Sequence, residues 1–135
     1  MTTPRGIANN NPGNIDRVPG VTWHGESADQ SKDPRFIVFD APEYGIRAIA
    51  RVIHSYFQQG HDTVEKIIST WAPSNENATG AYISAVAQWM KVEPEDVLTF
   101  PDCLTTMIPA IIHQENGEQP YSDEMIAQGI KLEEE

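Results

Sequence analysis

The sequence feature that most constrains the fold lies near its end, where an apolar helical stripe stops at a carboxylate. Side chains at steps of four, three and four residues form one face of an α-helix. The members of this stripe are Leu104, Ile108, Ile111 and Glu115. Asn116-Gly117 follows directly, and both residue types tolerate the left-handed conformation that commonly ends a helix. The pattern predicts that Glu115 lies in the last helical turn, on the buried side, beside an irregular loop.

Such a position disfavours an ionised carboxylate, because the C-terminal end of the helix dipole is negative and partial burial removes water from the charge. Both effects favour a protonated Glu115. A carboxylic acid that keeps its proton can act as a general acid in glycoside cleavage. The alternative is a glutamate that reaches solvent at a frayed helix end. Helical spacing alone leaves both interpretations open.

Apolar periodicity elsewhere predicts a mainly α (α+β) single domain over residues 1–135, with about five helices. Asp40 is expected to cap the first helix, Asp62 or Thr63 the second, and Ser122-Asp123 the last. We expect a short helical turn at Glu93–Asp96 and a solvated tail at Glu133–Glu135. The expected helices cover residues 42–60, 62–71, 79–90, 101–115 and 122–130, with a polar loop at 74–78.

Two further segments are rich in β-forming residues or turn residues. Residues 21–25 and 35–39 predict a short hairpin, on which Trp23 either packs or stacks on a sugar ring. Residues 9–14 read Asn-Asn-Asn-Pro-Gly-Asn, and Pro-Gly suits a type II turn. The turn is either a polar arm or a rigid loop whose amides bind hydroxyl and N-acetyl groups, since amides both donate and accept. We expect this turn to lie against the C-terminal end of the helix that carries Glu115, with the Trp23 hairpin forming the other wall of a groove.

Composition narrows the range of partners. The net charge of −11 argues against nucleic acid, because such binding depends on neutralising phosphates. No apolar run approaches membrane-spanning length and no hydrophobic signal region begins the chain, so we expect synthesis in a host cytoplasm and no membrane partner. The single cysteine, Cys103, excludes an internal disulfide and is expected to be buried. His54 and His61 lack ligand spacing, so no metal or other cofactor is expected.

Several motifs resemble those of a phage protein family. The C-terminal motif is AIIHQENGEQPYS (residues 110–122) and the N-terminal one is RGIANNNPGNI (residues 5–15). Between them stand FIVFD, EYGIRA and WAPSNENATGAYI. On these motifs the chain resembles small phage proteins described as virion-associated or lysozyme-like, over nearly its whole length. It departs from them at Ala8, where arginine is expected, and at His113-Gln114, where Arg-His is expected.

The resemblance implies a lysozyme-like helical domain, and a circular permutation would explain why the helix bearing the glutamate comes last. It also implies a muramidase or lytic transglycosylase that cleaves the bond between N-acetylmuramic acid and N-acetylglucosamine in peptidoglycan, with Glu115 as the general acid/base. A second carboxylate is left open among Asp16, Asp29, Asp33, Asp40 and Glu43. The expected substrate-binding residues are Asn9, Asn10, Asn11, Asn14, Trp23, Glu43, Asn116 and Tyr121.

Two hypotheses from other classes remain beside the enzyme. In the first, the chain is a non-catalytic virion component or host-interaction protein on the same scaffold, in contact with other virion proteins. In the second, it is a regulatory binder inside the host. The two departures from the motifs remove basic side chains near the expected site. That loss favours the non-catalytic hypothesis.

Overall fold

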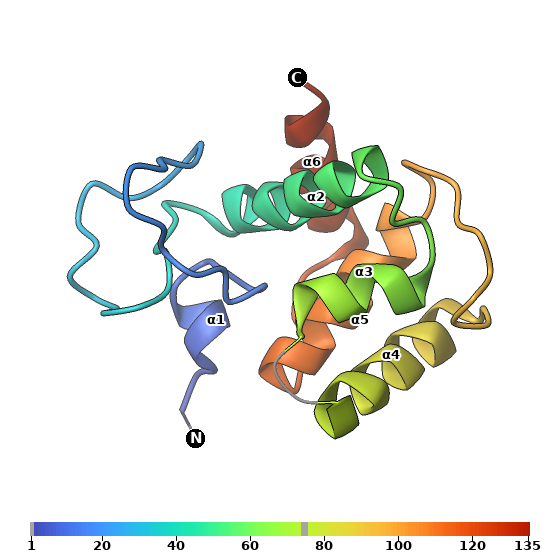
Figure 1. Cartoon of the computed structure of the whole chain (residues 1–135). Helices are drawn as coiled ribbons and strands as arrows, with labels where there is room; N and C mark the ends of the chain where they lie inside the picture. Colours follow the sequence, from blue (N-terminus) through green and yellow to red (C-terminus); the bar gives the residue numbers. More distant parts are fainter. Residues whose placement is uncertain (1, 74–75) are drawn as a thin grey trace.

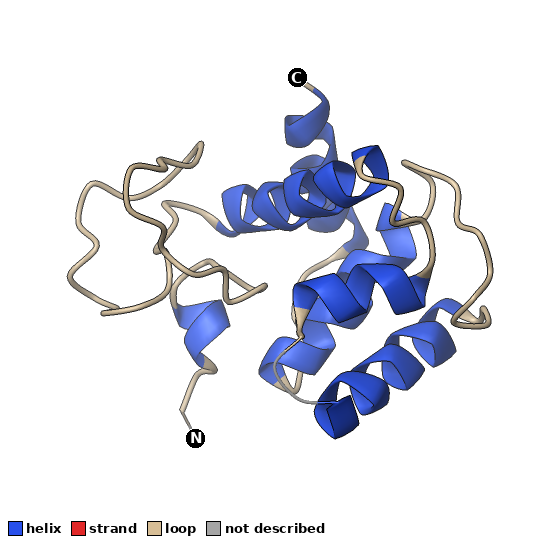
Figure 2. Cartoon of the chain, in the orientation of Figure 1, coloured by secondary structure: helices blue, strands red, loops and turns tan. Residues whose placement is uncertain are grey.

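The computed structural model describes residues 2–73 and 76–135, and within them the chain is mainly helical, as predicted (Figure 2). Figure 1 shows the N-terminal segment, coloured blue to cyan, on one side and the longer helices gathered on the other. The helices of the described residues are α1 (Arg5–Ala8), α2 (Pro42–Gln58), α3 (Val64–Trp71), α4 (Glu76–Met90), α5 (Leu104–Asn116) and α6 (Asp123–Glu134).

Helix α2 forms the most extensive helix–helix contact, with α6 (Figure 1). A glycine allows the two helices to approach closely. A side chain at Gly129 of α6 would meet Ile46 Cγ2 of α2 at 2.4 Å and the Glu43 carbonyl oxygen at 3.1 Å. The His54 ring of α2 also bonds Glu133 at 2.7 Å, and the Glu133 side chain is only 7% exposed. The predicted solvated tail is therefore wrong at Glu133, which lies in the last turn of α6.

Helix α5 runs through the main core. Its residues Met107, Ile108, Ile111 and Ile112 are each 0% exposed and pack with isoleucines of α2 and α3. The helix ends as predicted, because Gly117 has φ 76° and its N–H donates to the His113 carbonyl oxygen. Glu115 accordingly lies in the last turn, half-buried.

The predicted hairpin does not form. In the described residues the extended pairing is limited to two isolated antiparallel bridges, Asp16 with Phe36 and Glu26 with Phe39. The segment 36–39 therefore pairs with two different stretches. Its Ile37 and Phe39 side chains pack with Ala48 of α2 as a second, smaller core cluster.

Hydrogen bonds from side chains, and not a sheet, hold this N-terminal region together. The Arg17 guanidinium donates to four carbonyl oxygens, those of Gln30, Asp33, Pro34 and Phe36. Asp33, which is 3% exposed, accepts from the Arg5 guanidinium, from the Asn9 amide and from the backbone N–H groups of residues 35 and 36. Hydrogen bonding from Arg5 lowers the pKa of Asp33 well below its ordinary value.

Several helix boundaries differ from the prediction. Helix α1 was not predicted, and α4 begins at Glu76 rather than near residue 79. Ser74 and Asn75 of the predicted loop lie outside the described residues. The cap of α2 is Ala41, because the Asp40 carboxylate accepts from Ser27 instead. Residues 93–96 form a turn and not a helix, whereas Thr63 and Ser122 cap α3 and α6 as predicted.

Two further properties concern the described residues as a whole. No helix there combines the length and apolar character that a bilayer crossing requires. Nor do His, Cys, Asp and Glu side chains in residues 2–73 and 76–135 form a group of three or more that could hold a metal ion. Cys103 is buried, as predicted, and burial raises the pKa of its thiol to about 11.

Candidate functional site: the Glu115 groove

Three side chains from three different parts of the chain donate hydrogen bonds to the Glu115 carboxylate. Asn14 Nδ2 lies 3.0 Å from Oε1, whereas the Tyr82 hydroxyl and Trp71 Nε1 lie 3.0 and 3.3 Å from Oε2. These donors come from the N-terminal turn, from α4 and from the last residue of α3. Both carboxylate oxygens are thereby held in one orientation at the end of α5.

Glu115 lies on the wall of an open groove of about 540 Å³. The N-terminal loops and the ends of α2 and α3 supply the other walls. Trp71 contributes an aromatic face, and Asn14, Asp16 and Arg35 contribute polar groups. The remaining lining residues are Gly13, Ile15, Val18, Phe36, Val52, Tyr56, Ala72 and Pro73. The carboxylate is therefore reachable from solvent in a cleft that offers both hydrogen-bonding groups and apolar contacts, as ligand sites commonly do.

Tyr82 lies behind Glu115 and does not line the groove. Burial, together with the nearby Glu115 charge, raises the pKa of Tyr82 far above its ordinary value, so the phenol stays neutral. A neutral hydroxyl both donates and accepts hydrogen bonds. Tyr82 can therefore donate to an ionised Glu115 and accept from a protonated one.

The predicted contact between the asparagine-rich turn and the end of α5 is confirmed. Besides the Asn14 bond, the Asn116 amide donates to the Pro12 carbonyl oxygen at 2.8 Å. The turn is not type II, because the positive φ angles fall on Asn10 and Asn14, at 55° and 51°, and not on Gly13. Gly13 instead permits close packing, since a side chain there would meet Ile49 Cγ1 at 2.8 Å and Trp71 Cη2 at 3.1 Å.

The other asparagine amides of the turn bond within the fold. Asn9 is 2% exposed and donates to Asp33, while Asn10 donates to the Phe39 carbonyl oxygen. Asn11 is 0% exposed; its amide donates to the Ile15 and Ile37 carbonyl oxygens and accepts from the Ile15 N–H. None of these three residues lines the Glu115 groove. The Asn10 and Asn11 amides connect the turn to the segment 36–39, and the Asn9 amide connects it to Asp33.

The remaining predicted binding residues also lie outside the groove lining. The predicted wall formed by the Trp23 hairpin is wrong, because Trp23 packs against the Ile37–Phe39–Ala48 cluster. Glu43 lies in the first turn of α2, beside α6. Tyr121 packs against the main core, and burial, with the charge of Glu118, raises its pKa to about 12.

Of the candidate second carboxylates, Asp16 shares the groove with Glu115. Asp16 forms an ion pair with Arg35, whose Nε lies 2.6 Å from Oδ1. The others are placed elsewhere: Asp33 is buried against Arg5, Asp40 accepts from Ser27, Asp29 accepts from the Ser31 N–H and Glu43 lies beside α6.

Two hydrogen-bonding partners of Glu115 were not predicted as site residues. Trp71 and Tyr82 have the helical spacing of core side chains, and their ring atoms do pack against the core. Both stand within the segment WAPSNENATGAYI, and their polar atoms are what reach Glu115. An aromatic residue that carries a polar atom at a helix end is a signal that could have identified Trp71.

The chain is similar to a known phage protein. Over 130 residues it is 38% identical to Protein P5 of Pseudoalteromonas phage PM2, an alignment that covers 94% of this chain and 80% of the phage protein. No protein-family model matches the chain.

Proposed function

The chain belongs to the family of Protein P5 of Pseudoalteromonas phage PM2, and from this membership and the Glu115 groove we propose that it is a phage enzyme that cleaves peptidoglycan glycan strands. In this proposal Glu115 is the general acid/base of a muramidase or a lytic transglycosylase. The phage family agrees with the origin expected from the motifs. The lysozyme-like chemistry and association with the virion are parts of the proposal.

The observation that carries the proposal is a half-buried carboxylate on the wall of an open groove, oriented by Asn14, Trp71 and Tyr82. General acid–base catalysis needs a carboxyl group in a fixed position that a substrate atom can reach. A carboxylate that serves only packing would be expected to lie away from a groove of this size. Trp71 adds a flat apolar face of the kind on which a sugar ring stacks.

In the first step Glu115 would donate a proton to the glycosidic oxygen as the bond to the anomeric carbon breaks. In a transglycosylase the same carboxylate would then accept the proton of the C6 hydroxyl, which attacks the anomeric carbon and closes a 1,6-anhydro ring. Tyr82 suits both steps, because its neutral hydroxyl can accept a hydrogen bond from protonated Glu115 and donate one to the ionised carboxylate.

A muramidase would use a second carboxylate as well. Asp16 is the candidate that lines the same groove, and it is more than half exposed and paired with Arg35. Hydrolysis would place water on the Asp16 side of the sugar and leave a reducing end. The transglycosylase reaction requires only Glu115.

Digestion of purified peptidoglycan, followed by mass spectrometry of the fragments, tests the proposal. Fragments with 1,6-anhydro ends indicate a transglycosylase and fragments with reducing ends a muramidase. The Glu115→Gln variant is expected to lower turnover by about 10²- to 10⁴-fold, because glutamine cannot transfer the proton. Glu118→Gln is the matched control, since Glu118 is exposed three residues further along and does not line the groove. Full activity of Glu115→Gln would exclude Glu115 as the acid.

One feature favours a non-catalytic role in the virion. The hydrogen bonds of Glu115 join α3, α4, α5 and the N-terminal turn, and such a junction would also serve a purely structural protein. Under that alternative Glu115→Gln would lower the free energy of unfolding by several kcal/mol and no peptidoglycan product would form. The enzyme proposal expects a loss of no more than about 1 kcal/mol, because Asn14 can reverse its amide and accept from the new side chain.

A further inference from the structure

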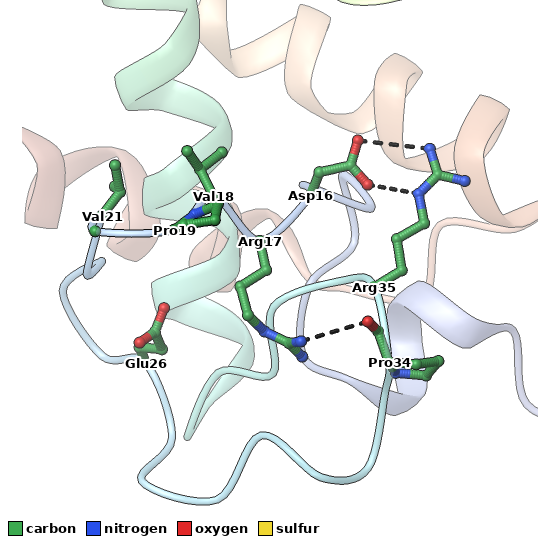
Figure 3. A pocket seen from close by; sticks show the side chains of 9 residues that line it. Asp16, Arg17, Val18, Pro19, Val21, Glu26, Pro34 and Arg35 are labelled. Carbon is green, nitrogen blue, oxygen red and sulfur yellow. Dashed lines mark hydrogen bonds and ion pairs between the residues drawn. The ribbon is translucent and has the colours of Figure 1, made fainter.

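A second hollow, of about 690 Å³, is lined by the residues drawn in Figure 3. Asp16, Val18 and Arg35 line both this hollow and the Glu115 groove. The Asp16–Arg35 ion pair therefore stands between two hollows on one side of the molecule. A ligand that fills both must pass across this pair, which is the arrangement expected for an extended chain and not for a single small molecule.

Arg35 presents unused hydrogen-bonding capacity at this junction. Its Nε lies 2.6 Å from Asp16 Oδ1 and its Nη2 lies 3.5 Å from Oδ2, so Asp16 occupies one edge of the guanidinium (Figure 3). Within the described part of the chain, Nη1 makes no hydrogen bond. The side chain is 66% exposed, so the free edge is open to a ligand. A guanidinium edge binds a carboxylate with two parallel hydrogen bonds.

The backbone at Arg35 is fixed before any ligand arrives. The N–H groups of Arg35 and Phe36 both donate to Asp33 Oδ1 at 2.8 Å. The guanidinium also lies 4.8 Å from the centroid of the Phe36 ring. Because Asp16 and Phe36 already restrict the side chain, binding at its free edge loses little further conformational entropy.

Charge is distributed unevenly along the chain, and Arg35 lies in the less acidic part. Residues 1–40 carry four basic and five acidic side chains, whereas residues 41–135 carry five basic and fifteen acidic ones. Arg35 is the basic residue among those lining the Glu115 groove. In the second hollow Arg17 has its guanidinium bonded to backbone carbonyl oxygens. An anionic group in the groove therefore finds its cationic partner at Arg35.

We infer that Arg35 is a specificity-determining residue that binds a carboxylate of a glycan chain lying across both hollows. The inference rests on the proposed function for its substrate class. The lactyl group supplies a carboxylate on alternate sugars only where the glycan carries no stem peptide, because the peptide is joined to that carboxyl by an amide bond. Such a denuded glycan is therefore favoured over an uncharged glycan of the same length. Arg35 thus contributes to binding, while Glu115 carries the chemistry.

The test is binding, measured by titration calorimetry on the Glu115→Gln protein so that cleavage does not interfere. Two oligosaccharides of equal length are compared, one with free lactyl carboxylates and one with the same groups converted to methyl amides. The protein is expected to bind the carboxylate form about 10-fold more tightly, which corresponds to one charge-assisted contact at a partly exposed site.

Further substitutions in the same protein test whether Arg35 causes the preference for the carboxylate form. Arg35→Gln is expected to abolish the preference, and Arg35→Lys to restore part of it. Asp16→Asn frees the whole guanidinium and is expected to tighten binding of the carboxylate form by up to about fivefold. Arg51→Gln, an exposed substitution outside both hollows, is the matched control. Melting temperatures confirm that each variant is folded.

The outcomes separate this inference from the proposed function. Equal affinity for the two glycans, or a preference that survives Arg35→Gln, overturns the role of Arg35 while cleavage by the wild-type protein still supports the enzyme. A preference lost in Arg35→Gln supports the inference, even when the wild-type protein cleaves nothing. Failure to bind either glycan overturns both.

Discussion

Replacement of Gly6 by alanine tests whether the N-terminal turn and the end of α5 form one packed unit. A Cβ at Gly6 would lie 2.5 Å from Asn116 Oδ1, 2.7 Å from Asn14 Oδ1 and 2.9 Å from the Asn11 carbonyl oxygen. The two amide oxygens lie at the ends of side chains, but both amides are anchored through their nitrogens. Asn14 bonds Glu115, and Asn116 bonds the Pro12 and Ile112 carbonyl oxygens.

The expected magnitude follows from these contacts. Overpacking of a filled site costs about 1–3 kcal/mol. Displacement of Asn14 also removes one hydrogen bond, worth about 1 kcal/mol. Alanine regains at most about 1 kcal/mol of helix propensity, because α1 is a single turn. We therefore expect Gly6→Ala to lower the free energy of unfolding by about 2 kcal/mol and the melting temperature by about 6 °C.

Gly80→Ala is the matched control for this measurement. Gly80 is an exposed residue inside α4, and a Cβ there would meet no atom within 4 Å. The same chemical change should raise stability by up to about 1 kcal/mol. Urea unfolding followed by circular dichroism compares the two variants with the wild-type protein. If Gly6→Ala proves as stable as Gly80→Ala, the packed unit described above does not exist.

Three further predictions concern stability. The Arg5 contact lowers the pKa of Asp33, so ionised Asp33 stabilises the fold above about pH 4, the ordinary pKa of an unfolded aspartate, and this stabilisation is lost as the pH falls below that value. Asp33→Asn should therefore lower the free energy of unfolding at pH 7 by about 2 kcal/mol. It should also make the melting temperature depend less on pH on the acid side of a titration. Gly45→Ala should cost more than 3 kcal/mol or prevent folding, as judged by urea unfolding, because its Cβ would lie 2.0 Å from the Asn10 backbone oxygen. Glu133→Gln should lower the free energy of unfolding by about 1 kcal/mol, as measured by urea unfolding, because it weakens the contact with His54. Exposed Glu134→Gln should change it by less than about 0.5 kcal/mol; equal effects would contradict the contact.

Features set by neighbouring residues could be predicted from the sequence. The end of α5 at Asn116-Gly117, the caps at Thr63 and Ser122, and the amphipathic α2 depend on interactions within a few residues. The place of Glu115 in the last turn follows from the same local rules. Its bonds to Trp71 and Tyr82 cross 44 and 33 residues, and no periodic pattern encodes which aromatic residue turns its polar atom toward it.

The hairpin prediction failed for a reason that local propensity does not contain. Residues 35–39 are rich in β-forming side chains, but side chains satisfy much of the backbone around them. Asp33 accepts from two backbone N–H groups, and Gln30 bonds both the N–H and the carbonyl oxygen of Val38. Once these groups are paired, a second strand is not needed to satisfy them.

The asparagine-rich turn shows why composition is a weak guide to a binding surface. Three consecutive asparagines suggest amides available to a sugar, yet Asn11 is 0% exposed and Asn9 is 2% exposed, and their amides bond within the fold. A segment with few apolar residues is held by polar side chains that form hydrogen bonds within the fold, because unpaired polar groups are costly to bury. Asn14 is the asparagine of the turn that lines the groove, where its amide donates to Glu115. The polar groups open to a ligand therefore come from elsewhere: the Glu115 carboxylate and the free edge of Arg35.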